Sequence, residues 1–198
     1  MLFYKRGGRL TSIRDYGADC DIRRASREAN KEYDLWVSLF KKKYDDRFLK
    51  KNPSYIGTDF CESWKVFSVF YEDLKSIYGY ENFSKGDWQL DKDILVKGNR
   101  TYSHITCCFV PKEVNKLLTS RKRFRGAHPI GVTWVKRDKV FLSQVSIEGK
   151  QHRLGYFKSE IEAFNAYKKA KESYIKEVAN KWKDQIDPKV YEALISWN

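Results

Sequence analysis

The chain has 198 residues, of which 41% are hydrophobic and 16% aromatic, so it is long enough for one large or two small packed domains. Its 39 Lys and Arg residues outnumber its 26 Asp and Glu residues, and the resulting net charge of +13 favours a polyanionic partner. No apolar run approaches the roughly 20 residues of a membrane span, and the start has neither the apolar region nor the cleavage site of a secretory signal. We therefore expect a cytoplasmic protein that binds nucleic acid and no membrane.

The N-terminal third predicts a basic arm followed by helices. Residues 1–25 are basic and contain glycine, and we expect a loosely ordered arm. Apolar residues then recur at helical spacing in residues 26–44, which predicts a helix with solvated lysines at its C-terminal end. A second helix is predicted over residues 62–77, and a loop over residues 79–86.

Residues 88–118 predict a strand, an Asn/Gly loop, a second strand and a short helix. Asp91 lies on the first strand, and Asn115 lies on the helix. The following segment, residues 119–128, carries four basic residues: Arg121, Lys122, Arg123 and Arg125. We interpret it as a basic linker, which either stays solvated or follows a phosphate backbone once DNA is bound.

The C-terminal part predicts three short strands over residues 130–136, 139–147 and 151–157, with a hairpin turn at Glu148-Gly149. Ser159 is placed to cap the N-terminus of a long amphipathic helix. On the second strand, alternation places Phe141, Ser143, Val145 and Ile147 toward the helix and Leu142, Gln144 and Ser146 away from it. Gln151, Arg153 and Tyr156 of the third strand are expected on the outward face.

These elements predict an α+β protein: N-terminal helices with a ββα core, then a three-stranded antiparallel sheet packed on one helix. The predicted parts are a basic arm (1–25), a first domain (26–118), a basic linker (119–128), a second domain (129–183) and a tail helix (184–198).

Four cysteines are present, Cys20, Cys61, Cys107 and Cys108, and none forms a CxxC pair. On a strand, the adjacent Cys107 and Cys108 would point to opposite faces. We therefore expect free thiols in a reducing compartment and no cysteine-based zinc site.

The second domain resembles the plant APETALA and ethylene-response-factor DNA-binding domain. The shared elements, in order along the chain, are Gly131-Val132, Phe141 with Val145, the LGYF run at 154–157, and Ala163 with Ala166-Tyr167. The resemblance implies that six residues face DNA: Thr133, Arg137, Gln144, Ser146, Gln151 and Arg153. Of these, Arg153 would suit guanine and Gln144 adenine. The family's arginine-rich first strand is missing, since Thr133 and Val135 stand there instead, and a generic sheet-and-helix interaction domain remains the alternative.

The first domain resembles the ββα-metal core of HNH endonucleases. The resemblance lies in Leu90-Asp91-Lys92-Asp93, Tyr102-Ser103-His104 and Val114-Asn115, with upstream support from Trp36, Tyr55-Ile56-Gly57 and Cys61-Glu62-Ser63-Trp64. It implies that Asp91 and Asn115 bind one divalent ion per active site, Mg²⁺ or Mn²⁺, whose hard character suits their oxygens. The alternatives are a turn or cap carboxylate for Asp91 and a capping or core amide for Asn115.

The HNH resemblance also implies a general base, and here Lys92 stands where histidine is usual. Since the ordinary pKa of lysine is about 10.4, its protonated side chain is a poor base and would instead hold phosphate or stabilise developing charge. Water activation would then fall to Asp93, to His104 or to the metal. The alternative for His104 is an ordinary surface loop residue.

The two resemblances together imply sequence-directed binding of double-stranded DNA with metal-dependent phosphodiester cleavage, as in small phage homing endonucleases acting in the bacterial cytoplasm. A homodimer is possible if both strands are cut. The main alternative is an inactive endonuclease derivative that serves as a DNA-binding regulator, and a third interpretation is an RNA-binding factor. Lys92 favours the regulator, whereas Asp91 and Asn115 favour the enzyme.

Overall fold

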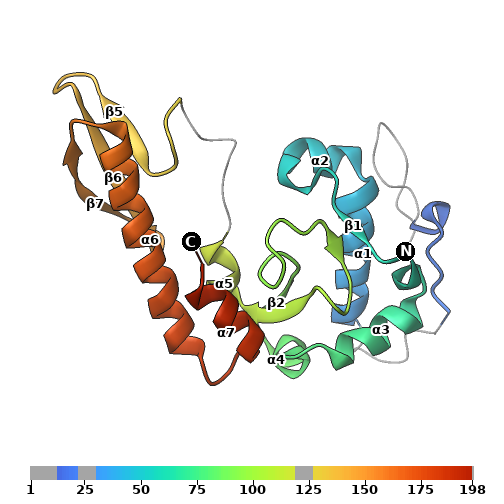
Figure 1. The fold of residues 1–198 in the computed structure, drawn as a ribbon. Helices are drawn as coiled ribbons and strands as arrows, with labels where there is room; N and C mark the ends of the chain where they lie inside the picture. The colour runs from blue at the N-terminus through green and yellow to red at the C-terminus, as the bar shows by residue number, and fades with distance from the viewer. Residues whose placement is uncertain (1–12, 22–29, 119–126, 198) are drawn as a thin grey trace. The chain divides into compact units, whose positions relative to one another are not determined.

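The computed structural model describes residues 13–21, 30–118 and 127–197. The chain divides into two compact units, Met1–Lys112 and Glu113–Asn198, and each is described by itself. The fold is mixed α+β, which confirms the predicted class, and its second unit contains a three-stranded antiparallel sheet packed on a long helix (Figure 1).

The first unit is mainly helical. Its helices and 3-10 turns are η1 (Ile13–Tyr16), α1 (Asn30–Tyr44), α2 (Asp46–Lys51), η3 (Pro53–Tyr55), η4 (Glu62–Lys65), α3 (Phe67–Ser76) and α4 (Tyr80–Lys85). Its strands are β1 (Asp59–Phe60), β2 (Trp88–Asp91), β3 (Thr101–Tyr102) and β4 (Cys108–Pro111). β1 pairs in parallel with β3, and β2 pairs antiparallel with β4 so that Asp91 lies opposite Cys108.

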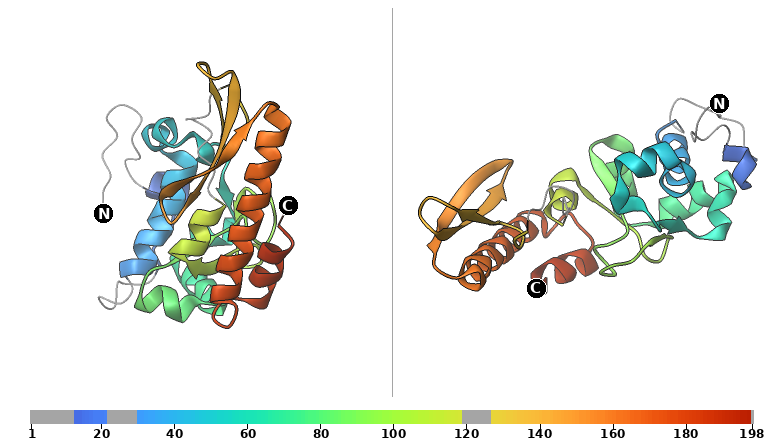
Figure 2. Two further views of the ribbon diagram at one scale, coloured as in Figure 1. Left: turned by 90° about the vertical axis from the view of Figure 1, so that its left-hand side faces the viewer. Right: turned by 90° about the horizontal axis from the view of Figure 1, so that it is seen from above.

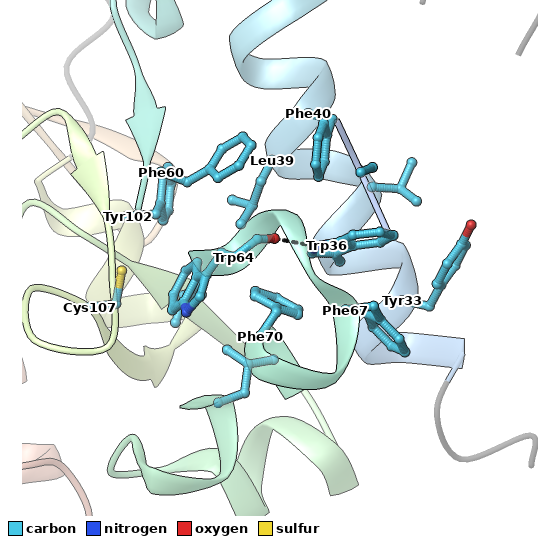
Figure 3. Packing of buried hydrophobic residues seen from close by; sticks show 14 of the residues in the cluster. Tyr33, Trp36, Leu39, Phe40, Phe60, Trp64, Phe67, Phe70, Tyr102 and Cys107 are labelled. Carbon is cyan, nitrogen blue, oxygen red and sulfur yellow. Dashed lines mark hydrogen bonds between the residues drawn. The ribbon is translucent and has the colours of Figure 1, made fainter. Parts of the chain in front are cut away.

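An aromatic core holds the first unit together. Trp36 of α1, Trp64 of η4 and Phe70 of α3 are fully buried and lie close together in Figure 3. The Trp36 indole nitrogen donates a hydrogen bond of 2.6 Å to the Trp64 carbonyl, which joins α1 to η4. Phe67 packs on the same indole at 5.2 Å between ring centroids. Burial of large aromatic rings on this scale is the main stabilising term for the unit.

The described part of the predicted arm, residues 13–21, is packed rather than loosely ordered. Ile13 and Ala18 are buried in the core. The Asp19 backbone bonds with the Lys65 carbonyl and the Phe67 N–H, and the Asp21 carboxylate accepts the Ser68 N–H at the start of α3. The rest of the predicted arm, and the basic linker residues 119–126, lie outside the described residues.

Two helix boundaries differ from the sequence prediction. The helix expected over residues 62–77 is broken at Val66, whose extended backbone forms a bridge with Asp19. The loop expected over residues 79–86 is instead the short helix α4, because Phe83 is buried and stacks on Phe109 with 4.7 Å between ring centroids. In both places a contact with a distant segment outweighs the local pattern.

The second unit consists of a sheet and three helices: β5 (Val132–Val135), β6 (Val140–Ile147), β7 (Lys150–Phe157), α5 (Lys112–Leu117, beginning at the unit boundary), α6 (Glu160–Trp182) and α7 (Pro188–Ile195). The strand order is β5-β6-β7, with both pairs antiparallel, as predicted. Ser159 caps α6 by accepting the Ile161 N–H, also as predicted. In Figure 2 the sheet lies against the N-terminal part of α6.

The boundary between the units falls before Glu113 rather than after residue 118. The Glu113 carboxylate accepts hydrogen bonds from the Lys181 ammonium at 2.8 Å and from the Trp182 indole at 2.8 Å, so α5 is tied to the end of α6. The tail helix α7 also packs on α6 through the fully buried Val190 and Leu194. Among the described helices, none is long and apolar enough to cross a membrane.

Replacing Gly131 by alanine should destabilise the second unit by more than about 1 kcal/mol, since alanine resists positive φ. Gly131 has φ +79°, and an added Cβ would lie 2.1 Å from the Tyr167 ring. Gly149→Ala is the matched control, because Gly149 has φ +81° but its Cβ would meet nothing within 4 Å. Urea unfolding followed by circular dichroism measures both, and equal losses would contradict a role for the Tyr167 contact.

Candidate nucleic-acid interface and charged cluster

The outer face of the β5-β6-β7 sheet carries most of the predicted DNA-facing residues. Cross-strand pairing places Thr133 opposite Leu142, Gln144 opposite Arg153, and Ser146 opposite Gln151. Alternation along each strand therefore puts these side chains on one face, as predicted from the sequence. Arg137 lies outside this face, in the β5–β6 turn, where its guanidinium pairs with Asp138 at 2.8 Å.

A β-bulge in β7 sets the direction of Arg153. Ser143 pairs with Gly155 and the next residue, Gln144, pairs with Arg153, so Leu154 is the extra residue of β7. Arg153 and Tyr156 are three positions apart and would face opposite sides of a regular strand. Because of the bulge, both share the outer face, where Tyr156 is 56% exposed. The signal in the sequence is Gly155, whose φ of +145° favours glycine.

The inner face of the sheet is covered by α6. Ser143 and Val145 are buried, and the Ser143 hydroxyl donates a 2.7 Å hydrogen bond to the Ala163 carbonyl of α6. The outer face contains no acidic residue at its outward strand positions: Thr133, Val135, Val140, Leu142, Gln144, Ser146, Gln151, Arg153 and Tyr156. The sheet therefore presents amide, hydroxyl, guanidinium and aromatic groups with no carboxylate to repel a polyanion.

In the first unit, Asp91 lies at the end of β2 and organises the turn that follows. Its Oδ1 atom accepts the backbone N–H groups of Asp93 at 2.7 Å and Ile94 at 2.8 Å. Burial raises the pKa of Asp91, and the neighbouring Asp93 charge adds to this, while the two backbone hydrogen bonds and Lys92 oppose it. Asp91 therefore caps the turn, which was the alternative to metal binding in the sequence analysis. Its carboxylate is also largely removed from solvent.

Lys92 is buried, and its ammonium group is held inside the loop between β2 and β3. It donates to Asp93 Oδ1 at 2.6 Å and to the Asn99 carbonyl at 2.9 Å. The Asn99 amide completes the closure by donating to the carbonyls of Lys92 and Thr101. Lys92 thus stabilises the loop and binds Asp93. In this arrangement its ammonium group neither acts as a base nor points outward to bind an anion.

His104 faces a carboxylate that the sequence interpretation did not single out. Its Nδ1 atom lies 3.4 Å from Oδ2 of Asp73 on α3, and the same oxygen accepts the Trp64 indole N–H at 2.7 Å. Half of the His104 side chain is exposed. An imidazole oriented through Nδ1 by a carboxylate keeps Nε2 for proton transfer. Asp73 lies on α3 and His104 in the turn between β3 and β4, so no local spacing could have linked the two residues.

Lys42 is the second residue that the sequence interpretation missed, since it was assigned to a solvated helix end. Its ammonium lies 3.3 Å from the Tyr102 hydroxyl and 4.9 Å from the centre of that ring. The pKa of Lys42 is lowered to about 8: burial is the main cause and the charge of Lys92 contributes, while Cys107 and Asp91 act in the opposite direction. Lys42, Asp91, Lys92 and Tyr102, together with Asp93, Tyr55 and Cys107, form one electrostatically connected set, here called the Tyr102 cluster.

The predicted metal ligands fall in different units. Asp91 belongs to the first unit and Asn115 to α5 of the second, so their joint coordination of an ion stays a prediction. Within residues 13–21, 30–118 and 127–197, no group of three or more His, Cys, Asp or Glu side chains is arranged to hold a metal. Mg²⁺ commonly uses only one or two carboxylates, with water and phosphate oxygens completing its octahedron. Asp91 and Asp93 are near neighbours in the sequence, and together they provide the one or two carboxylates that such a Mg²⁺ site needs.

Comparisons of this chain with protein-family models, with curated proteins and with solved structures find no match.

Proposed function

We propose that the protein binds double-stranded DNA in a sequence-directed manner and cleaves its phosphodiester backbone with a divalent metal ion. The DNA-binding part is supported chiefly by the outer face of the β5-β6-β7 sheet, whose outward strand positions carry no acidic residue and include groups that suit base edges. The net charge of +13 adds a sequence-independent attraction to phosphates.

The sheet would enter the major groove, which is wide enough for a β-ribbon and presents a distinct pattern for each base pair. Arg153 and Gln144 lie opposite each other on β7 and β6, so one would face guanine and the other adenine in neighbouring positions. Ser146 and Gln151 form the next cross-strand pair and extend the same row. The proposed binding site is therefore an array of cross-strand pairs rather than a single helix.

The cleavage part of the proposal centres on the Tyr102 cluster. Asp91 would hold Mg²⁺ or Mn²⁺, with Asp93 beside it as a further oxygen donor, while a role for Asn115 stays a prediction from the HNH resemblance. Such an ion stabilises the charge that develops on the leaving oxygen. His104, which faces Asp73 through Nδ1, would accept a proton from water. This activity fits a cytoplasmic protein, because a reducing compartment would keep its four cysteines as thiols, and none of them forms a disulfide.

A second candidate function is a DNA-binding regulator that does not cut. One observation favours it: Lys92, at the position where the general base is expected, is held in an internal ion pair with Asp93. Supercoiled plasmid incubated with and without Mg²⁺ or Mn²⁺ separates the two functions. Metal-dependent nicking supports the enzyme, whereas tight binding without nicking supports the regulator.

Replacing Arg153 by alanine should weaken binding to a selected duplex by about 1–3 kcal/mol and relax the preference at one base position. Lys189→Ala, which removes the same charge from the exposed part of α7, should change affinity little. Fluorescence anisotropy across a salt series measures both, with competing duplex RNA as a check on the RNA-binding alternative. Equal effects of the two variants, or an affinity that does not fall with salt, would contradict the proposed interface.

A further inference from the structure

We propose that Lys42 binds a phosphate group of the DNA backbone beside Asp91, within the Tyr102 cluster. This inference rests on the proposed function, because it assigns the phosphate to a DNA substrate. It concerns a residue on α1, a helix that carries none of the residues that the HNH resemblance places in the active site.

The position of Lys42 is fixed by two tyrosine rings. Its ammonium lies 4.9 Å from the Tyr102 ring centre and 5.5 Å from that of Tyr55, and it donates toward the Tyr102 hydroxyl at 3.3 Å. Cation–π contacts of this kind hold an ammonium without neutralising it. Lys42 is thus positioned by aromatic groups while its positive charge remains available to an anion.

The two neighbouring cations differ from Lys42 in their partners. Lys43 pairs with Asp59, and Lys92 pairs with Asp93. Lys42, by contrast, has no carboxylate within ion-pair distance in the described part of the chain. Lys42 is partly buried, and a partly buried ammonium without an ion-pair partner is energetically unfavourable. Its pKa is accordingly lowered to about 8, chiefly by burial. An anion bound next to it would offset the penalty.

Phosphate is the anion that the surrounding groups favour. Burial and nearby negative charges raise the pKa of Tyr102, so its hydroxyl stays protonated and can donate a hydrogen bond to a phosphate oxygen. Asp91 interacts electrostatically with Lys42, so a phosphate held there would lie near the carboxylate that is proposed to bind the metal. A lysine acts on phosphate as a point charge and needs no bidentate geometry, which suits a position between two rings.

A competitive acetylation experiment tests the site directly on the full-length protein. The lowered pKa of Lys42 favours its neutral, reactive amine at pH 8 over that of an ordinary lysine. A trace of N-hydroxysuccinimidyl acetate is added, and mass spectrometry follows the acetylation of each lysine. The probes are a mixed-sequence DNA duplex and inorganic phosphate, each matched in ionic strength with chloride. Several-fold protection of Lys42 by the duplex, without equal protection of Lys41, is the expected result.

The other outcomes are distinct. Protection by neither probe overturns the proposal, and protection by phosphate alone overturns the assignment to DNA and indicates a site for a free phosphate compound. If anisotropy shows that the duplex binds while Lys42 still reacts at its full rate, the Lys42 proposal fails and DNA binding stands. If the duplex does not bind at all, the proposed function fails. Protection of Lys42 by inorganic phosphate then shows separately whether Lys42 forms an anion site.

A variant experiment provides a second readout. Loss of one phosphate contact lowers the slope of log affinity against log salt by about 0.9, so Lys42→Met should reduce the slope by that amount. Lys41→Met removes the same charge from the adjacent position of α1 and should leave the slope unchanged. Methionine keeps the helix propensity and buries no charge, so Lys42→Met should not lose thermal stability. An equal slope change in both variants, or none in either, would overturn the contact.

Discussion

Replacing Asp91 by asparagine should lower metal-dependent nicking of supercoiled plasmid by about 100-fold or more, since even residues that only support a metal ligand commonly contribute 10–100-fold. Asparagine keeps the Oδ1 atom that accepts the N–H groups of Asp93 and Ile94, so the turn after β2 should survive. The change removes the negative charge that a divalent ion requires. Loss of nicking with an intact fold would therefore identify Asp91 as a metal ligand rather than a capping group alone.

The control for this experiment is Asp87→Asn, which makes the same charge change at an exposed position just before β2. It should nick at the wild-type rate. Near-ultraviolet circular dichroism checks that both variants keep their packed tryptophans. Wild-type nicking by Asp91→Asn would mean that the carboxylate serves the turn only, and the metal site would then have to be sought elsewhere.

Replacing Trp36 by alanine should destabilise the first unit by about 3–5 kcal/mol, the usual result of removing a large buried aromatic side chain. Trp36 is fully buried and packs against Phe40 and Phe67, each at 5.2 Å between ring centroids. Its removal would leave a cavity and would also leave the Trp64 carbonyl without its indole donor. Urea unfolding followed by tryptophan fluorescence and circular dichroism measures the loss.

The variant Trp36→Phe separates the contribution of aromatic packing from that of the hydrogen bond to the Trp64 carbonyl. It keeps much of the aromatic packing and removes the hydrogen bond to Trp64, so we expect a clearly smaller loss than for alanine. Equal losses in the two variants would show that the hydrogen bond dominates. A loss below about 1 kcal/mol for Trp36→Ala would contradict the central place of this ring in the core.

The sheet of the second unit could be predicted from the sequence because alternation is a local property. Of the four β6 side chains expected to face the helix, Ser143 and Val145 are buried, and Phe141 and Ile147 are partly buried. The helix α4 could not be predicted in the same way. Its formation depends on Phe83 packing against Phe109, a partner that a window around Phe83 does not contain.

At the candidate site of the first unit, too, contacts between segments far apart in the sequence could not be predicted. The motif around Asp91 and Lys92 was visible in the sequence, since its residues are adjacent. Lys42 and Asp73 come from α1 and α3, and only the folded chain brings them to Tyr102 and His104. The sequence also could not show that the Lys92 ammonium is held by Asp93 and the Asn99 carbonyl.

The bulge at Leu154 makes the outer face of the sheet depend on strand length as well as on residue identity. Residues before it and after it are out of phase by one position, and only this offset brings Arg153 and Tyr156 to the same side. Deletion of one residue here would turn Gln151 and Arg153 toward α6 and His152 outward, with no substitution at any contact position. Among related chains, a single-codon insertion or deletion in β7 would therefore change base preference in one step, where substitutions would need several.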